Sequence, residues 1–152
     1  MSDVELTVTS YDSPEAIELI AELQADLAVR YGSGDETPVA AVQFDRPHGL
    51  FLIGSDDGHL VACSGIRLTA PGVAELKRMY VRAAARRRGI ARLMLARLED
   101  EARSLGATQL RLETGIRQPE AVAMYEACGY IATEPFGHYA DTPGARHLAK
   151  RL

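Results

Sequence analysis

The segment Val81-Arg82-Ala83-Ala84-Ala85-Arg86-Arg87-Arg88-Gly89-Ile90-Ala91 separates two stretches with different hydrophobic patterns. Before it, Val73–Val81 is typical of a strand, and after it apolar residues recur on one helical face through Ile90–Leu105. The first backbone N–H groups of a helix are free donors, and the helix dipole favours an anion beside them. Gly89 lets a ligand approach the backbone closely. The segment therefore predicts a strand, a loop and a helix that together bind a diphosphate, with arginines supplying charge.

The distribution of charge supports a local anionic ligand. The net charge is −4, but residues 1–60 carry −10 and residues 61–152 carry +6. Seven cations with no intervening acid lie between Lys77 and Arg92. A nucleic-acid-binding protein is more often basic overall. A solvated surface turn and a nucleic-acid patch remain the alternatives for this run.

Length and composition indicate one globular domain over residues 1–152, with 47% hydrophobic and 25% charged residues. The N-terminus lacks a basic start followed by an apolar run, and no segment has the length of a membrane span, so we expect a cytoplasmic protein.

Cys63 lies in an apolar strand, and Cys128 follows a helix, where the dipole disfavours a thiolate. The four histidines lack metal-ligand spacing, so we predict no metal site.

The remaining elements complete a mixed α/β sheet. Strands are expected at Val4–Thr9, Leu50–Ile53, His59–Thr69, Thr108–Thr114, Tyr130–Phe136 and His147–Leu152, and helices from Ser13 to Gly32, near Val39–Phe44 and at Pro119–Cys128. The resulting order is β α (α) β β β α β α β β. The helix that follows Val81 connects two strands, which favours a right-handed parallel crossover.

Two nucleotide-binding motifs are absent from the sequence. It has no glycine-rich loop ending in Gly-Lys-Ser/Thr and no G-x-G-x-x-G, and its only G-x-G is Gly32-Ser33-Gly34 on an acidic turn. These absences argue against ATP hydrolysis and against NAD binding by the usual motifs.

Two motifs resemble those of the GNAT N-acetyltransferase superfamily. Arg86–Ala91 matches the family's Q/R-x-x-G-x-G/A loop, and Gln118–Tyr130 resembles its second signature, N-x-x-A-x-x-x-Y-x-x-x-G-F/Y. The element order fits that fold over nearly the whole chain. Gln118 stands where the family usually has Asn, and Ala91 where it often has a second Gly.

The resemblance implies an acetyl-CoA site and acetyl transfer to an amine. The diphosphate would bind the N–H groups from Arg87 to Ala91, and the pantetheine arm would pair with the preceding strand, which a bulge would splay from its neighbour. The implied residues that bind the acyl donor are Met79, Tyr80, Val81, Arg86, Arg87, Arg88, Gly89, Ile90, Ala91, Arg92 and Gln118.

The resemblance also implies catalytic roles. Tyr125 matches a tyrosine that often serves as general acid toward the CoA sulfur, and Glu75 lies where related histone acetyltransferases carry a base. A backbone N–H near Met79 would hold the oxyanion. Alternation places Glu75 on the face of Lys77 and Met79 unless a bulge intervenes. The alternatives are a core aromatic at position 125, a paired surface charge at position 75, and His138 as the base.

The acceptor is less defined by the sequence. In the family its pocket is built from regions that correspond to Tyr31–Phe44 and Pro135–Ala145, where Phe136, His138 and Tyr139 are candidate lining residues. Asp35 and Glu36 suggest an acidic rim for a cationic amine, or simply a solubilising surface. We expect a small-molecule or peptide amine as acceptor, with no nucleic acid or membrane, and leave a homodimer open. A GNAT-shaped regulatory module that binds acyl-CoA without turnover is the competing hypothesis.

Overall fold

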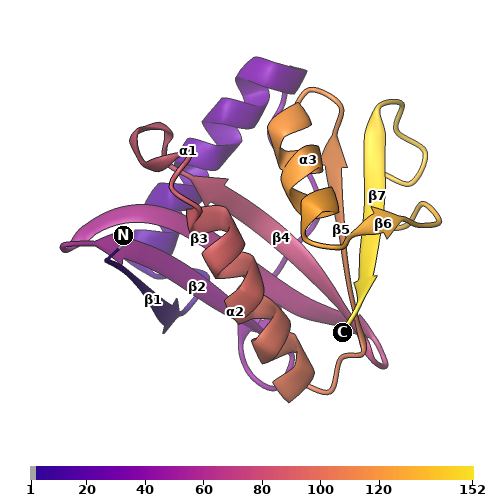
Figure 1. Cartoon of the computed structure of the whole chain (residues 1–152), viewed down its shortest axis with the longest axis horizontal. Helices are drawn as coiled ribbons and strands as arrows, with labels where there is room; N and C mark the ends of the chain where they lie inside the picture. The colour runs from indigo at the N-terminus through magenta and orange to yellow at the C-terminus, as the bar shows by residue number, and fades with distance from the viewer. Residues whose placement is uncertain (1–2) are drawn as a thin grey trace.

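The computed structural model describes residues 3–152 and contains one seven-stranded sheet (Figure 1). The strand order is β1-β2-β3-β4-β5-β7-β6. The chain order agrees with the prediction from sequence, so the expected fold class is confirmed. The elements are β1 (Val4–Thr9), α1 (Pro14–Tyr31), the short 3₁₀ helix η1 (Ala41–Phe44), β2 (Gly49–Asp56), β3 (His59–Ala70), β4 (Val73–Val81), the 3₁₀ turn η2 (Ala83–Ala85), α2 (Ile90–Ser104), β5 (Gln109–Gly115), α3 (Pro119–Ala127), β6 (Ile131–Ala132) and β7 (Ala145–Arg151).

Helices cover both faces of the sheet. In Figure 1, α2 and α3 lie in front of the strands and α1 lies behind them. The core on the α2 and α3 face contains Met94 and Leu98 packed on Leu110 and Leu112. On the α1 face, Leu19 packs with Phe44 and Phe51. Burial of these side chains supplies most of the stabilisation, and it fixes which strand residues point toward which helix.

The parallel pair β4 and β5 opens after three residue pairs. Val73, Ala74 and Glu75 lie opposite Gln109, Leu110 and Arg111, and no later residue of β4 pairs with β5 within the described chain. Figure 1 shows the two strands diverging from that point. The opening therefore separates β4 from β5, which are the parallel pair among the described strands. The GNAT resemblance implies that β4 diverges from its neighbour at this place.

A bulge in β4 accompanies the opening. Arg78 has a left-handed φ of 59°, and the register with β3 shifts between Cys63 and Gly65. Lys77 and Arg78 are both buried, while Met79 packs against the core on the α2 face. The bulge therefore separates Met79 from the face of Glu75 and Lys77, so the simple alternation does not hold across it.

Several predicted boundaries are confirmed locally. Ser13 Oγ accepts a hydrogen bond from the Ala16 N–H at 3.2 Å, and Gly32 ends α1 with φ of 86°. The Asp57-Gly58 turn has positive φ at both residues, as a tight hairpin requires.

Two strand boundaries differ from the prediction. Strand β2 continues to Asp56 because a register shift at Gly54 and Ser55 absorbs the expected break. The strand expected over 130–136 is reduced to Ile131–Ala132, since Pro135 has no N–H to donate and Tyr130 turns into the core. Within residues 3–152, no helix is both long enough and apolar enough to cross a membrane.

Candidate acetyl-transfer site

The loop before α2 presents free backbone donors. Arg87 and Gly89 have positive φ, of 65° and 77°, and the first backbone hydrogen bond of α2 runs from the Leu93 N–H to the Gly89 carbonyl at 3.0 Å. Among residues 3–152, no acceptor receives the N–H groups from Arg87 to Arg92. A Cβ built at Gly89 would meet no atom within 4 Å. Free donors, open space and a helix N-terminus together suit a diphosphate.

The cationic run is divided between several environments. Lys77 and Arg78 are buried on the α1 face, and Arg82 pairs with Glu22 of α1 at 2.7 Å and with Glu18. These three cations are therefore neutralised within the protein, and the prediction of one continuous cationic segment facing an anion is wrong for them. The arginines of the loop itself, Arg86–Arg88, remain exposed.

The exposed arginines are partly engaged. Arg86 Nε donates to the Val81 carbonyl at 3.0 Å, and an Arg88 Nη atom lies 2.7 Å from Asp56 Oδ2. Val81 is one of the residues expected to bind the pantetheine arm, so its carbonyl is satisfied by a side chain in this state. These contacts are exposed and worth little individually, which allows an anion to replace them.

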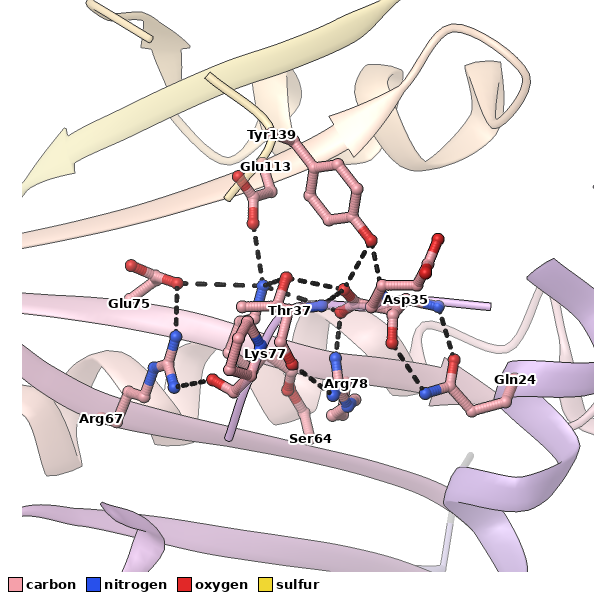
Figure 2. Close-up of polar contacts among 12 residues, drawn as sticks. Gln24, Asp35, Thr37, Ser64, Arg67, Glu75, Lys77, Arg78, Glu113 and Tyr139 are labelled. Atoms are coloured by element: carbon pink, nitrogen blue, oxygen red, sulfur yellow. Dashed lines mark hydrogen bonds and ion pairs between the residues drawn. The ribbon is translucent and has the colours of Figure 1, made fainter. Parts of the chain in front are cut away.

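Lys77 lies at the start of the opening between β4 and β5. Its Nζ is 2.8 Å from Glu113 Oε1 of β5, so this ion pair crosses the opening. The same Nζ is 3.1 Å from Thr37 Oγ1 (Figure 2). The same ammonium lies 3.6 Å from Asp35 and 3.8 Å from Glu75. The lysine side chain is 3% exposed. Three carboxylates from three segments therefore converge on one buried cation.

Asp35 connects two loops to the bulge. Its carboxylate contacts Arg78 and accepts hydrogen bonds from Thr37 and, at 3.1 Å, from the Tyr139 hydroxyl. Burial raises the pKa of Asp35, but the nearby charges of Lys77 and Arg78 and the Thr37 hydrogen bonds outweigh it and lower the pKa to about 2. Gln24 of α1 holds the Asp35 backbone through both its amide atoms.

Asp35 is therefore an internal counter-ion. The interpretation of Asp35 as part of a free acidic rim is not supported by these contacts, because its carboxylate is used by residues of the chain itself. Glu36, its neighbour, remains exposed.

Glu75 lies between two arginines on neighbouring strands. It is opposite Arg67 of β3 and opposite Arg111 of β5. Its Oε1 is 3.4 Å from an Arg67 Nη atom, and its Oε2 is 3.7 Å from an Arg111 Nη atom. Glu75 is 4% exposed. Accepting a proton at Glu75 would weaken ion pairs to Arg67, Arg111 and Lys77 at once.

Two further residues of this face were not singled out from the sequence. Glu113 of β5 and His147 of β7 are directly opposite each other, with Glu113 Oε2 3.7 Å from His147 Nε2. The Phe136 ring packs edge-on against His147, with ring centroids 5.1 Å apart. Neither residue belongs to a recognisable motif. Alternation along β5 places Arg111 and Glu113 on one face of the sheet and Leu110 and Leu112 on the other, and this is the only sequence signal for a shared polar face.

An open hollow of about 460 Å³ adjoins these residues. It is lined by Thr37, Pro38, Gln43, Arg67, Leu68, Thr69 and His138. These residues come from the two regions expected to form an acceptor pocket and from β3. Arg67 is the one permanently charged side chain among these lining residues.

The second motif positions Tyr125 and Gln118 at opposite ends of α3. Tyr125 is buried in the core of the α2 face and packs edge-on against Tyr130 at 5.9 Å. Burial raises the pKa of Tyr125 above its usual value of 10. Gln118 precedes the first turn, and its Oε1 accepts from the Tyr31 hydroxyl at 3.1 Å.

Other reactive groups lie outside this arrangement. Cys63 is fully buried, and its pKa is raised to about 12 because burial disfavours the thiolate. No group of three or more metal-ligating side chains occurs within residues 3–152.

Comparison with known proteins identifies the family. Residues 18–130 match the family model described as "Acetyltransferase (GNAT) family". The chain belongs to the GNAT acetyltransferase family. The match includes β4, the loop with free donors and α3, and so covers both predicted motifs. This GNAT protein is therefore an acetyltransferase by family.

Relatives and solved structures agree with the assignment. An IAA acetyltransferase of Azospirillum brasilense is 35% identical over 137 residues, which span 90% of each chain. A solved Klebsiella pneumoniae structure, provisionally described as an acyl-CoA N-acyltransferase, is 30% identical with a TM-score of 0.86, covering 99% of this chain and 98% of that one.

A more distant structure shares the fold alone. It is an Elizabethkingia anophelis GNAT acetyltransferase with acetyl-CoA bound, with 14% identity, a TM-score of 0.72 and full coverage of both chains.

Proposed function

We propose that this GNAT protein transfers an acetyl group from acetyl-CoA to a primary amine by direct attack within a ternary complex. The observation that carries the proposal is the combination of the free N–H groups before α2 with the opening between β4 and β5. The first suits the diphosphate of CoA. The second leaves unpaired strand edges, which an extended pantetheine arm can complete as an added strand.

The residues proposed to hold the acyl donor follow from this geometry. Backbone N–H groups from Arg87 to Ala91 bind the diphosphate, with Arg86, Arg88 and Arg92 adding charge, and the β4 segment Met79-Tyr80-Val81 faces the pantetheine arm. Arg86 must release the Val81 carbonyl if that group is to bind the arm. Gln118 lies at the start of α3, and its amide nitrogen is available while Tyr31 holds the oxygen.

Tyr125 is proposed to assist departure of the thiolate. Its pKa is raised by burial, so the phenol is protonated at neutral pH and is a donor rather than a base. The leaving thiolate, whose conjugate thiol has a pKa near 8.5, is a weaker base than the tyrosine phenolate. Tyr125 therefore donates a hydrogen bond to the sulfur as the carbon–sulfur bond breaks, with little complete proton transfer.

The proton of the attacking amine needs an acceptor on the opposite face. Glu75 was the candidate from sequence, but it is surrounded by Arg67, Lys77 and Arg111. Within residues 3–152, Glu113 Oε2 and His147 Nε2 have no hydrogen-bond partner. The geometry supports the pair Glu113 and His147 as proton acceptor, with Glu75 holding the three cations in position.

The first experiment is thermal unfolding with acetyl-CoA, CoA and ATP in parallel, followed by thiol release with a panel of amines. A ligand at 100 times its Kd stabilises the native state by about 2.7 kcal/mol, which raises Tm by several degrees. We expect a rise with acetyl-CoA and CoA but not with ATP. IAA, the compound named for the Azospirillum relative, belongs in the panel.

The Tyr125→Phe variant tests the catalytic part of the proposal. We expect kcat to fall by about 10² and by no more than about 10⁴, with acetyl-CoA binding unchanged. Full activity in this variant would remove Tyr125 from the reaction. Binding of acetyl-CoA with no amine turned over would support the regulatory-module alternative.

A further inference from the structure

Four buried polar side-chain atoms lack a hydrogen-bond partner within residues 3–152, and they come from β3, β5 and β7, on the α1 face of the sheet. They are Arg67 Nε, Arg111 Nε, Glu113 Oε2 and His147 Nε2. Arg67 and Arg111 flank Glu75 across β3, β4 and β5, and Glu113 is opposite His147 on β5 and β7. Because most buried polar groups in proteins are paired, this concentration marks a place where a ligand completes the hydrogen bonding.

The arginine end of this group favours an anion. The Arg67 guanidinium is anchored by the Pro38 carbonyl at 3.1 Å and Gln43 Oε1 at 2.9 Å. The Arg111 guanidinium lies 4.1 Å from the centre of the Phe136 ring. Their shared partner, Glu75, is at the long distances of 3.4 and 3.7 Å. Two guanidinium groups with incomplete pairing are suited to a carboxylate, whose two oxygens match their donors.

The other end favours an amine. Glu113 Oε2 and His147 Nε2 are 3.7 Å apart, which is too far for a hydrogen bond between them. A nitrogen that carries hydrogens can donate to Glu113 Oε2 and lie against His147 at the same time. Lys77 donates to the other Glu113 oxygen at 2.8 Å and so orients this carboxylate.

The spacing between the two ends limits the size of the ligand. Arg111 and Glu113 are two residues apart on β5, which separates their Cα atoms by about 7 Å. Since both side chains lean over the same face, an amine and a carboxylate separated by a few bonds can reach both ends. Arg67 also lines the open hollow of about 460 Å³, which has room for a small side chain beyond the two charged groups.

We propose that the acceptor of this enzyme is a small zwitterion of the amino-acid class, with its carboxylate between Arg67 and Arg111 and its amine at Glu113 and His147. The inference rests on the proposed function and names the acceptor class. It replaces the cationic amine that an acidic rim would favour, because Asp35 of that rim is paired with Arg78 and Lys77. Since the four atoms are buried, binding requires the loops joined by Tyr139 and Asp35 to separate.

The test compares matched amines that differ only in the carboxylate. Acetyl-CoA turnover is followed by thiol release with the twenty amino acids, their carboxamides, and spermidine. A carboxamide lowers the basicity of the neighbouring amine, so more of it is neutral, and reactivity alone favours the amide. We expect at least one amino acid to exceed its carboxamide by tenfold or more in kcat/KM, with spermidine inactive.

Variants assign the preference to the site. Arg111→Gln and Arg67→Gln should raise KM for the preferred amino acid tenfold or more. The kcat/KM of that amino acid should then equal the kcat/KM of its carboxamide, and the KM for acetyl-CoA should be unchanged. Arg103→Gln, at an exposed pair with Asp100 on α2, is the matched control and should behave as wild type. Because Arg67 is buried and its variant is at risk of misfolding, Arg111→Gln carries the test, with Tm measured for each.

The outcomes separate this inference from the proposed function. Preference for carboxamides or spermidine, or a carboxylate preference that survives Arg111→Gln, overturns the inference and leaves acetyl transfer in place. Acetyl-CoA binding without turnover of any panel amine also overturns it. Absence of acetyl-CoA binding removes the proposed function itself. As a readout besides activity, the preferred amino acid should raise Tm further in the presence of CoA, and its carboxamide should not.

Discussion

Replacement of Asp35 by Asn should destabilise the protein in a way that depends on pH. Asn has nearly the shape of a protonated Asp, so Asp35→Asn isolates the charge. The Asp35 side chain is 16% exposed, and its pKa is lowered from the usual 3.8 to about 2, because Lys77, Arg78 and Thr37 together outweigh the cost of burial. A shift of nearly two units corresponds to about 2–3 kcal/mol of free energy of unfolding at neutral pH.

The direction of the pH dependence follows from the lowered pKa. The native state holds the proton of Asp35 less tightly than the unfolded chain, so the carboxylate stabilises the fold above its unfolded pKa, near 4. That stabilisation is lost as the pH falls through the native pKa of about 2, and it vanishes only below that pH, where both states are protonated. The difference between wild type and Asp35→Asn should therefore be full at pH 7, about half as large near pH 3, and close to zero only below pH 2.

Urea unfolding followed by circular dichroism at pH 7, 5, 4 and 3 measures this difference. Glu36→Gln is the matched control, since Glu36 is the adjacent but exposed acid, and its effect should stay within about 0.5 kcal/mol. A difference below about 0.5 kcal/mol at pH 7 for Asp35→Asn, or one that is equal at pH 7 and pH 3, would show that the Asp35 ion pairs do not stabilise the fold.

Four other substitutions, at three positions, test the donor loop and the core. Gly89→Val should abolish the Tm rise with acetyl-CoA, because a side chain at a φ of 77° strains the loop and blocks the free N–H groups. Asn tolerates this backbone conformation, so Gly89→Asn should keep the Tm of the free protein. Gly89→Asn should still lose affinity in a CoA titration. Gly65→Ala should lower stability by about 1–3 kcal/mol in urea unfolding, since its Cβ would lie 2.5 Å from the Phe51 ring. Tyr130→Phe should cost about 1–2 kcal/mol in the same assay, because the Glu99 carboxylate loses a hydrogen bond of 2.8 Å from the tyrosine hydroxyl; an unchanged unfolding midpoint would contradict either stability prediction.

The two groups proposed to handle protons lie on opposite faces of the sheet, as one reaction in the opening would require. Tyr125 lies on the α2 and α3 face, and Glu113 lies on the α1 face, with the β4–β5 opening between them. An acyl donor in the opening would present its leaving group to one face and its carbonyl to the other. This arrangement explains why the strands must diverge immediately after Glu75 and Arg111.

Local sequence patterns were sufficient to predict the order of elements and the loop before α2. These features depend on local rules: alternation in Val73–Val81, helical spacing after Ile90, and Gly89 where the chain needs a left-handed residue before a helix. The two GNAT motifs are local in the same sense, because each lies within one loop and one helix. The sequence also predicted the parallel crossover, because a helix joins the two strands.

The pairing of the charged residues on the α1 face depends on the tertiary structure. Whether a charged residue is a free ligand or an internal counter-ion depends on partners distant in the sequence, as Asp35 and Arg78 show. The bulge at Arg78 changed the face of Met79, which alternation does not reveal. Glu113 and His147 belong to no motif, and they meet only because β5 and β7 pair in one particular register, which leaves Glu113 Oε2 and His147 Nε2 buried without a hydrogen bond within residues 3–152.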